Sequence, residues 1–179
     1  MDVNSAIENR VTSYHFSDKD VSEEMVVNII ESAVKAPVAG GVREYEFIII
    51  TGKEGKKQLS ELSMTPNIDS APFIVVVVCD KTKLEAVFDD KDSETFCVEN
   101  VSLAIENMLL TATSLGLGSA WISTLKQEPI NKSLNIPANY IVRGVIPMGY
   151  TAEQGTKKKN PAVDISKLVH LEKFNNNAE

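Results

Sequence analysis

The chain has 179 residues, of which 43% are hydrophobic and 24% charged, which is typical of one globular domain with a sizeable core. Its formal net charge of −7 argues against nucleic acid and anionic membrane surfaces as partners. No apolar run approaches the roughly 18 residues that indicate a membrane-spanning helix, and the first ten residues do not resemble a signal peptide, so we expect a cytoplasmic protein.

The first third of the chain predicts two helices. Residues 3–9 can form a short helix. Asp20 and Glu23 resemble a capping box that opens a second helix, which continues to Ala36. Pro37 ends that helix, because proline disfavours helical geometry in the residue before it.

A glycine-containing turn, residues 38–42, leads into the first predicted strand, residues 45–51. The strand carries the continuous apolar run Phe47 to Ile50, which predicts burial on both faces. A helix with one polar face follows over residues 53–62. The β-branched run of residues 73–79 is the most strand-like segment of the chain.

Residues 80–96 are acidic and irregular, and we interpret them as a surface loop with one short helix. A buried helix should follow, because apolar residues recur every three or four positions. These residues are Val98, Val101, Ile105, Met108, Leu109, Ala112 and Leu115.

Gly116 and Gly118 permit the tight backbone that ends this helix, and a strand begins at residue 120. The hairpin would place the backbone N–H groups of Ser123 and Thr124 at a strand end, where flat ligands tend to bind in α/β sheets. The alternative is a core helix packed on a core strand with no ligand.

The last part of the chain predicts a short helix over residues 128–134, a strand over 140–150 and a polar loop over 151–161. The alternation of helices and strands favours an α+β domain with a mixed central sheet surrounded by helices. We assign residues 1–179 to a single domain. Residues 163–179 would form a C-terminal arm that docks elsewhere, for example on a second subunit.

Two cysteines, Cys79 and Cys97, fall in a predicted strand and a predicted helix. Buried thiols in a reducing compartment are favoured over a disulfide. With only His15 and His170 and no CxxC or HExxH motif, we expect no metal site.

Three small groups of residues are candidates for binding an anion. Arg10 and Thr12 offer a guanidinium and a hydroxyl, which together can hold a phosphate. A lysine triplet occupies residues 157–159 and would matter if it lay near Arg10. Gly40 and Gly41 would let the backbone approach a ligand closely. Solvated side chains and a plain turn are the alternatives.

The sequence contains no phosphate-binding loop motif and no nucleophile elbow, and it offers no obvious general base. Phosphate-binding candidates without a catalytic side chain favour a protein whose cofactor performs the chemistry while the chain orients it.

The order of these segments resembles the nitroreductase family of FMN-dependent oxidoreductases over nearly the whole chain. The family pattern AIxxRRSxRxF corresponds to residues 6–16, and APSxxNxQPWxF corresponds to residues 36–47 at identical length. Asp69 to Pro72, the helix end and glycines of residues 107–119, Gly149-Tyr150 and the late Lys-x-Lys-x-Pro of residues 157–161 complete the resemblance.

The resemblance implies an α+β homodimer that binds FMN at the subunit interface. Arg10 and Thr12 would hold the phosphate together with Lys157 and Lys159. Backbone amides of Ser123 and Thr124 would face the flavin near its N5. The full set of implied cofactor contacts is Arg10, Val11, Thr12, Tyr14, Pro37, Val38, Gly41, Arg43, Asn67, Ser123, Thr124, Lys157 and Lys159.

Within that set, Pro37, Val38 and Gly41 would pack on the flavin from the other subunit, and Asn67 would donate to the ring. No side chain is implied as a catalytic acid or base, since the flavin N5 carries the hydride. The implied activity is hydride transfer from NAD(P)H to the flavin and then to an acceptor such as a nitroaromatic or quinone.

Several positions depart from the family patterns. Val11 replaces an arginine and Tyr14 a basic residue, while Val38, Gly41 and Arg43 replace serine, asparagine and glutamine. These changes remove phosphate and ring donors, each worth about 1.5–3 kcal/mol. They support a second hypothesis, in which the chain is a ligand-binding or regulatory protein without turnover.

Overall fold

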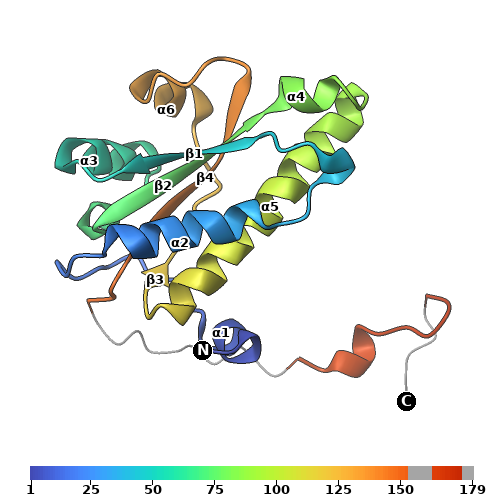
Figure 1. Cartoon of the computed structure of the whole chain (residues 1–179), viewed down its shortest axis with the longest axis horizontal. Coiled ribbons are helices and arrows are strands. Elements are labelled where there is room, and N and C mark those ends of the chain that lie inside the picture. The colour runs from blue at the N-terminus through green and yellow to red at the C-terminus, as the bar shows by residue number, and fades with distance from the viewer. Residues whose placement is uncertain (153–162, 175–179) are drawn as a thin grey trace.

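The computed structural model describes residues 1–152 and 163–174. Its centre is a four-stranded sheet in the order β1-β2-β4-β3, with helices on both faces (Figure 1). The strands are β1 (Tyr45–Ile50), β2 (Phe73–Asp80), β3 (Gly118–Ser119) and β4 (Tyr140–Gly149). All three strand pairs are antiparallel, and a parallel pairing occurs at the isolated bridge between Thr12 and Ser119. The α+β class is therefore confirmed.

Helices pack on both faces of this sheet. The helices α2 and α5 share one apolar cluster with the odd-numbered residues of β2 from Phe73 to Cys79, and α3 and α6 share the other cluster with the even-numbered ones. The helices are α1 (Val3–Asn9), α2 (Glu23–Val34), α3 (Lys53–Leu62), α4 (Lys81–Glu85), α5 (Asp90–Ser114) and α6 (Gln127–Ser133). This arrangement explains why every residue of β2 is buried.

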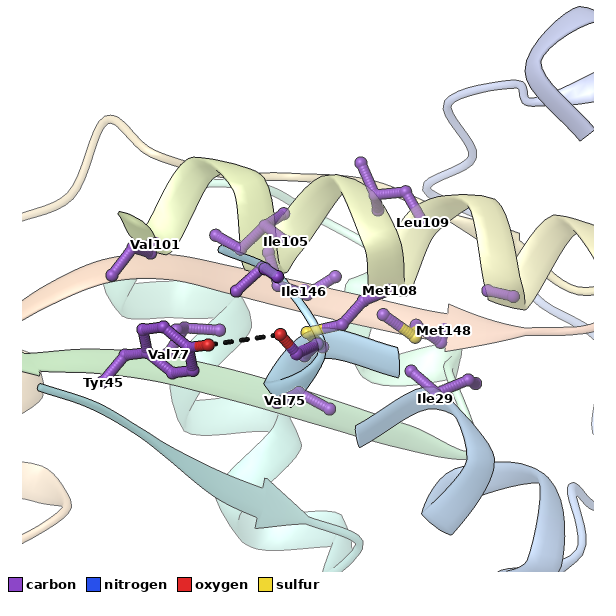
Figure 2. Packing of buried hydrophobic residues seen from close by; sticks show 14 of the residues in the cluster. Ile29, Tyr45, Val75, Val77, Val101, Ile105, Met108, Leu109, Ile146 and Met148 are labelled. Atoms are coloured by element: carbon purple, nitrogen blue, oxygen red, sulfur yellow. Dashed lines mark hydrogen bonds between the residues drawn. The ribbon is translucent and has the colours of Figure 1, made fainter. Parts of the chain in front are cut away.

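The predicted apolar stripe of α5 lies against the sheet. Ile105 and Met108 are fully buried between α5 and the strands, and they pack with Ile146 and Met148 of β4 (Figure 2). Val98 was expected in the same stripe, but its side chain is 45% exposed. The buried face of α5 runs through Cys97 and Val101 instead, so Val98 lies beside the stripe and not on it.

The structure corrects the prediction of an acidic loop over residues 80–96. This stretch holds α4 and the first two turns of α5, which is 25 residues long. Asp89 is the N-cap of α5 and accepts a 2.8 Å hydrogen bond from the backbone N–H of Asp92. Asp90 and Asp92 lie in the first turn, where carboxylates favour the positive end of the helix dipole. The acidic residues thus start a helix.

The capping residue of α2 was also predicted wrongly. Ser22, two residues after Asp20, is the N-cap, and its hydroxyl accepts a 3.3 Å hydrogen bond from the N–H of Met25. The helix ends at Val34, before Ala36. Serine and aspartate are comparable N-cap residues, so the choice between them depends on how the preceding chain enters the helix.

The apolar run of β1 predicted burial on both faces, but the strand is partly exposed. It is an outer strand of the sheet, and it pairs with β2. Along one face exposure rises from 3% at Tyr45 to 45% at Ile49. Tyr45 is held at the covered end, where its hydroxyl donates a 3.3 Å hydrogen bond to the carbonyl of Ala33 in α2 (Figure 2). An apolar run alone cannot distinguish an outer strand from a central one.

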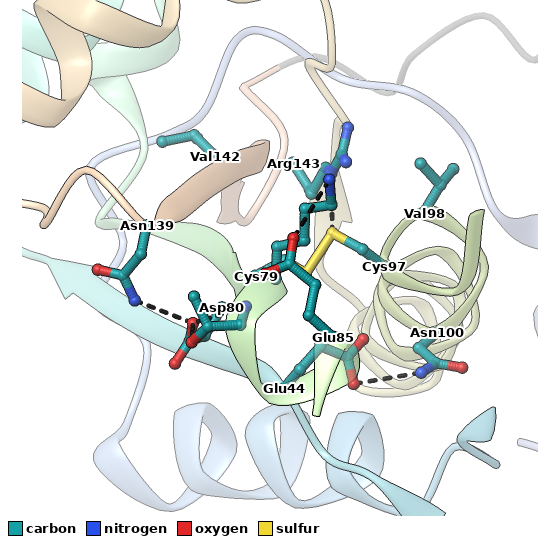
Figure 3. Close-up of a disulfide and its surroundings, with 12 residues drawn as sticks. Glu44, Cys79, Asp80, Glu85, Cys97, Val98, Asn100, Asn139, Val142 and Arg143 are labelled. Carbon is teal, nitrogen blue, oxygen red and sulfur yellow. Dashed lines mark hydrogen bonds and ion pairs between the residues drawn. A yellow bond between two sulfur atoms is a disulfide. The ribbon is translucent and has the colours of Figure 1, made fainter. Parts of the chain in front are cut away.

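Cys79 of β2 and Cys97 of α5 are both fully buried, as expected, but they are joined by a disulfide (Figure 3). The prediction of two free thiols is therefore wrong. The helix α5 crosses the end of β2, which brings the two Cα atoms to 6.2 Å from each other. The Arg143 Nε also donates to the Cys97 sulfur at 3.2 Å. Sequence spacing gives no sign of this crossing.

The predicted C-terminal arm extends beyond α1, away from the sheet (Figure 1). Its described part, residues 163–174, carries large apolar side chains that are mostly exposed, with Ile165 at 69% and Phe174 at 82%. The predicted lysine loop lies outside the described residues, and so do Lys157 and Lys159. None of the described helices combines the length and hydropathy needed to cross a membrane.

Candidate functional site

The segment after α1 lies along the end of the sheet. The backbone of Thr12 bridges Ser119 of β3, and the N–H of Ser13 donates to the Ser119 carbonyl at 2.9 Å. Farther on, Phe16 bridges Thr151, just after β4. Residues 10–16, which we call the N-terminal segment, are therefore fixed by backbone pairing next to β3 and the end of β4.

Gly118 makes this close approach possible. A Cβ atom at residue 118 would collide with the Thr151 side chain and would lie 3.1 Å from the Ser13 Cβ. The second glycine of the predicted hairpin is thus required by the packing of the N-terminal segment, in addition to any role in ending α5. The hairpin and the N-terminal segment form one unit.

The backbone amides of Ser123 and Thr124 lie at the end of a strand pairing, as predicted. The last pairing before them is Ile122, whose N–H donates to the Val145 carbonyl at 3.1 Å. Within residues 1–152 and 163–174, no hydrogen bond uses the N–H of either residue. Two adjacent backbone donors are therefore available to a ligand.

Tyr14 lies beside these donors. Tyr14, Ser123 and Thr124 line one shallow pocket. The sequence did not indicate its other wall, which consists of Ser63, Met64, Thr65, Trp121 and Ile122. Met64 has a φ of +51°, in the left-handed region that non-glycine residues seldom adopt. A single residue in this conformation after a helix leaves no signal in the sequence pattern.

Arg10 and Thr12 supply the side-chain donors of this region. Arg10 caps α1 and is half-buried, while Thr12 is exposed. No carboxylate in the described part of the chain forms an ion pair with the Arg10 guanidinium. Val11, between them, is half-buried and adds no polar side-chain atom. A guanidinium and a hydroxyl without an internal acceptor are suited to an external anion.

Asn67 belongs to a turn that is tied to the N-terminal segment. It adopts a left-handed conformation with a φ of +71°, and its carbonyl accepts a 2.6 Å hydrogen bond from the Ser70 hydroxyl. The same hydroxyl accepts from the N–H of Phe16 at 3.1 Å. The Asn67 side chain is exposed and does not line the pocket. It lies near the other candidates, one turn away from Ser63 to Thr65.

The remaining candidates lie at the other end of α2. Pro37, Val38 and Gly41 follow its C-terminus, whereas the N-terminal segment precedes its start. Twelve helical residues at 1.5 Å each separate the two ends by about 18 Å. One chain therefore places Tyr14, Ser123 and Thr124 around one pocket, with Arg10 and Thr12 on the same N-terminal segment, and none of the residues of the glycine turn, residues 37–41, lines that pocket.

Arg43 is used within its own region of the chain. Its Nη2 donates a 2.9 Å hydrogen bond to the carbonyl of Val34, the last residue of α2. A cation at this place satisfies a free helix carbonyl and favours the negative end of the helix dipole. This contact accounts for Arg43 without a ligand.

Two buried polar residues lie behind the glycine turn, and the sequence pattern did not indicate them. Asn100 of α5 accepts a 3.0 Å hydrogen bond from the N–H of Ala39. It also donates one of 3.2 Å to the Glu44 carboxylate (Figure 3). Glu44 is fully buried. Burial raises the pKa of its carboxyl, because the ionised form loses hydration, and the Asn100 hydrogen bond partly opposes this.

This raised pKa predicts a pH-dependent effect of Glu44→Gln. The folded state binds the Glu44 proton more tightly than the unfolded state, so this group stabilises the fold below the unfolded pKa and loses that contribution as pH rises through the folded pKa. Glutamine does not titrate. We therefore expect the stability of the variant relative to wild type to increase as pH rises above the ordinary glutamate pKa of 4.5 and through the raised pKa of Glu44 in the folded state.

Urea unfolding at a series of pH values measures this difference. Glu99→Gln is the control, because Glu99 is exposed on α5 beside Asn100. A difference between Glu44→Gln and wild type that stays constant with pH would show that Glu44 does not titrate abnormally in the folded state.

The chain is similar to known proteins over most of its length. The model of the nitroreductase family matches residues 7–69 and 62–150. A protein of Methanothermobacter thermautotrophicus, described provisionally as an NADH dehydrogenase/NAD(P)H nitroreductase, is 33% identical over 180 residues, which cover 97% of this chain and 88% of the relative. An FMN reductase [NAD(P)H] of Bacillus subtilis is 28% identical over 178 residues, covering 92% of this chain and 71% of the relative.

Solved structures agree with these sequence matches. An FMN-dependent nitroreductase from Clostridium difficile superposes with a TM-score of 0.79 at 27% identity, covering 94% of this chain and 98% of that one. NfrA2 of B. megaterium has a TM-score of 0.87 at 24% identity, covering 98% of this chain and 76% of that one, and supports the fold.

Proposed function

This chain belongs to the nitroreductase family, and on that premise we propose that it is an FMN-dependent oxidoreductase. It would pass a hydride from NAD(P)H through the flavin to a small acceptor such as a nitroaromatic or a quinone. When bound, FMN supplies the redox chemistry, so the chain needs residues that bind and orient it but no catalytic acid or base.

The donor set of the site fits this cofactor. The observation that carries the proposal is that the Arg10 guanidinium has no carboxylate partner within residues 1–152 and 163–174, and that its segment, with the Thr12 hydroxyl, abuts the amides of Ser123 and Thr124, which make no hydrogen bond within the same residues. Arg10 and Thr12 would hold the phosphate, joined by Lys157 and Lys159. The two amides would donate to the polar edge of the flavin ring, and Tyr14 would form the rim of its pocket.

We further propose that the active form is a homodimer. The glycine turn follows the C-terminal end of α2, a helix about 18 Å long, and none of its residues lines the pocket that holds Tyr14, Ser123 and Thr124, so a second chain would have to supply it. Pro37, Val38 and Gly41 would then pack on the flavin from the partner. The exposed apolar side chains of the arm, residues 163–174, are suited to embracing that partner.

Two measurements test this proposal. Purified protein should take up added FMN and retain its yellow absorbance on gel filtration at the mass of two chains. With saturating FMN it should oxidise NADH or NADPH in the presence of menadione. Protein that stays colourless and catalyses no turnover under these conditions would refute the assignment.

A second function is favoured by the residues that line the site. Val11 adds no polar side-chain atom where the family pattern has arginine, and Arg43 donates to the Val34 carbonyl. Such a site could hold a ligand as a binding or regulatory protein without turnover. Flavin uptake without NAD(P)H oxidation would select this alternative, whereas brisk menadione-dependent turnover would exclude it.

A further inference from the structure

The glycine turn is supported from inside the fold by a pair of buried polar side chains. Glu44 is fully buried and Asn100 is 3% exposed. Asn100 uses both ends of its amide, since Oδ1 accepts from the Ala39 N–H at 3.0 Å and Nδ2 donates to the Glu44 Oε2 at 3.2 Å. The three groups form a chain of hydrogen bonds from the residue before β1 to the turn, and Figure 3 shows the link between Glu44 and Asn100.

The chemistry of the partners allows one orientation of the Asn100 amide. A backbone N–H can only donate, so it requires the amide oxygen. The ionised carboxylate, and the carbonyl oxygen of the protonated acid, can only accept, so Glu44 Oε2 takes its hydrogen bond from the amide nitrogen. Glu44 and Ala39 therefore act together on Asn100. Reversing the amide would break both hydrogen bonds inside the core, where unpaired polar groups are costly.

The turn has a fixed inner side and a bare outer side. Gly40 has a φ of +58°, and a Cβ atom there would lie 2.6 Å from the ring of Phe88. Gly41 has a φ of +71° and is exposed, and its missing Cβ would meet no atom within 4 Å. The anchors of the turn are on the core side, and the bare backbone of Gly41 is left to face whatever binds outside.

We propose that Asn100, oriented by Glu44, is a positioning residue that holds the glycine turn in the conformation in which Gly41 packs on the FMN of the partner subunit. This inference rests on the proposed function. The family pattern quoted above has proline at the position of Glu44, and proline offers no side-chain acceptor to Asn100.

A double-mutant cycle tests the hydrogen-bond chain. Glu44→Gln alone should preserve it, because the glutamine oxygen accepts from Asn100. Asn100→Asp alone sets two carboxyl groups against each other and should speed amide exchange at Ala39 by roughly tenfold. Combining the two changes exchanges the donor and the acceptor, and exchange at Ala39 should return to within about twofold of wild type.

The readouts are the amide hydrogen exchange of Ala39 in the FMN-free protein and the Kd for FMN. Asn100→Leu, which removes the acceptor, should speed Ala39 exchange and weaken FMN binding, each by roughly tenfold. If Asn100→Leu unfolds the protein, the comparison of Asn100→Asp with the double variant still decides the matter.

The outcomes separate this inference from the proposed function. Wild-type protein that takes up no FMN would refute the proposed function, whereas Ala39 exchange would still report on the hydrogen-bond chain. Wild-type protein that binds FMN, together with an Asn100→Asp variant that the second change does not rescue, would overturn the role of Glu44. An unchanged Kd in Asn100→Leu, despite faster exchange, would overturn the positioning role.

Discussion

Replacing Arg10 and Lys159 together by alanine is expected to weaken FMN binding by about two to four orders of magnitude. Each would contribute a charge-assisted hydrogen bond to the phosphate, worth about 1.5–3 kcal/mol. Arg10 is half-buried, and no carboxylate among the described residues competes for it, so little of this energy is spent on internal contacts. Lys159 lies outside the described residues and is included because of the family pattern.

Fluorescence titration with FMN at low and at moderate salt measures this effect, which should decrease as salt screens the charges. Lys57→Ala is a suitable control because Lys57 is exposed on α3. Its neighbour Lys56 is unsuitable, since its Nζ donates to the Ala71 carbonyl at 2.6 Å. Equal effects of the double variant and of Lys57→Ala would mean that Arg10 and the lysine loop are merely solvated.

Truncating Ile105 to alanine is expected to lower the free energy of unfolding by about 2–5 kcal/mol, or the melting temperature by roughly 4–20 °C. Ile105 is fully buried at the centre of α5 and belongs to the cluster that joins α2, α5 and the sheet (Figure 2). Removing three carbons there leaves a cavity, because the surrounding elements can close it only partly.

Val98→Ala is the matched control on the same helix. The apolar periodicity places Val98 and Ile105 on one stripe, but Val98 is 45% exposed and should cost less than about 1 kcal/mol. Thermal unfolding of both variants under identical conditions compares them. Similar losses for the two residues would contradict the placement of the buried stripe.

Elements with a strong and continuous apolar signal could be predicted from the sequence. The strand β2, the C-terminal half of α5 and the strand β4 appeared where the pattern of apolar residues placed them. The start of α5 could not be predicted, because Asp90 and Asp92 resemble a solvated loop until the N-cap at Asp89 is known. The exposure of Ile49 likewise depends on the order of the strands.

The candidate site likewise has features that the sequence predicts and features that it does not. The strand-end amides of Ser123 and Thr124 followed from a local pattern, since a hairpin defines them, whereas Tyr14 beside them was named only through the resemblance to the family. The pairing of Asn100 with Glu44 joins residues 56 positions apart. The disulfide depends on how α5 crosses β2. Both contacts depend on how distant segments pack in the folded chain, and the local residue pattern of one sequence does not reveal that packing.

The length of α2 has a thermodynamic consequence for the proposed dimer. In that dimer each chain would contribute two half-sites, one from the N-terminal segment and one from the glycine turn beyond α2, so a ligand that requires both would bind only to associated chains. Linkage then makes the two equilibria reciprocal, because the cofactor tightens subunit association by the same factor by which association tightens the cofactor. Diluting the protein would therefore promote dissociation of the flavin, and loss of the flavin would promote dissociation of the subunits.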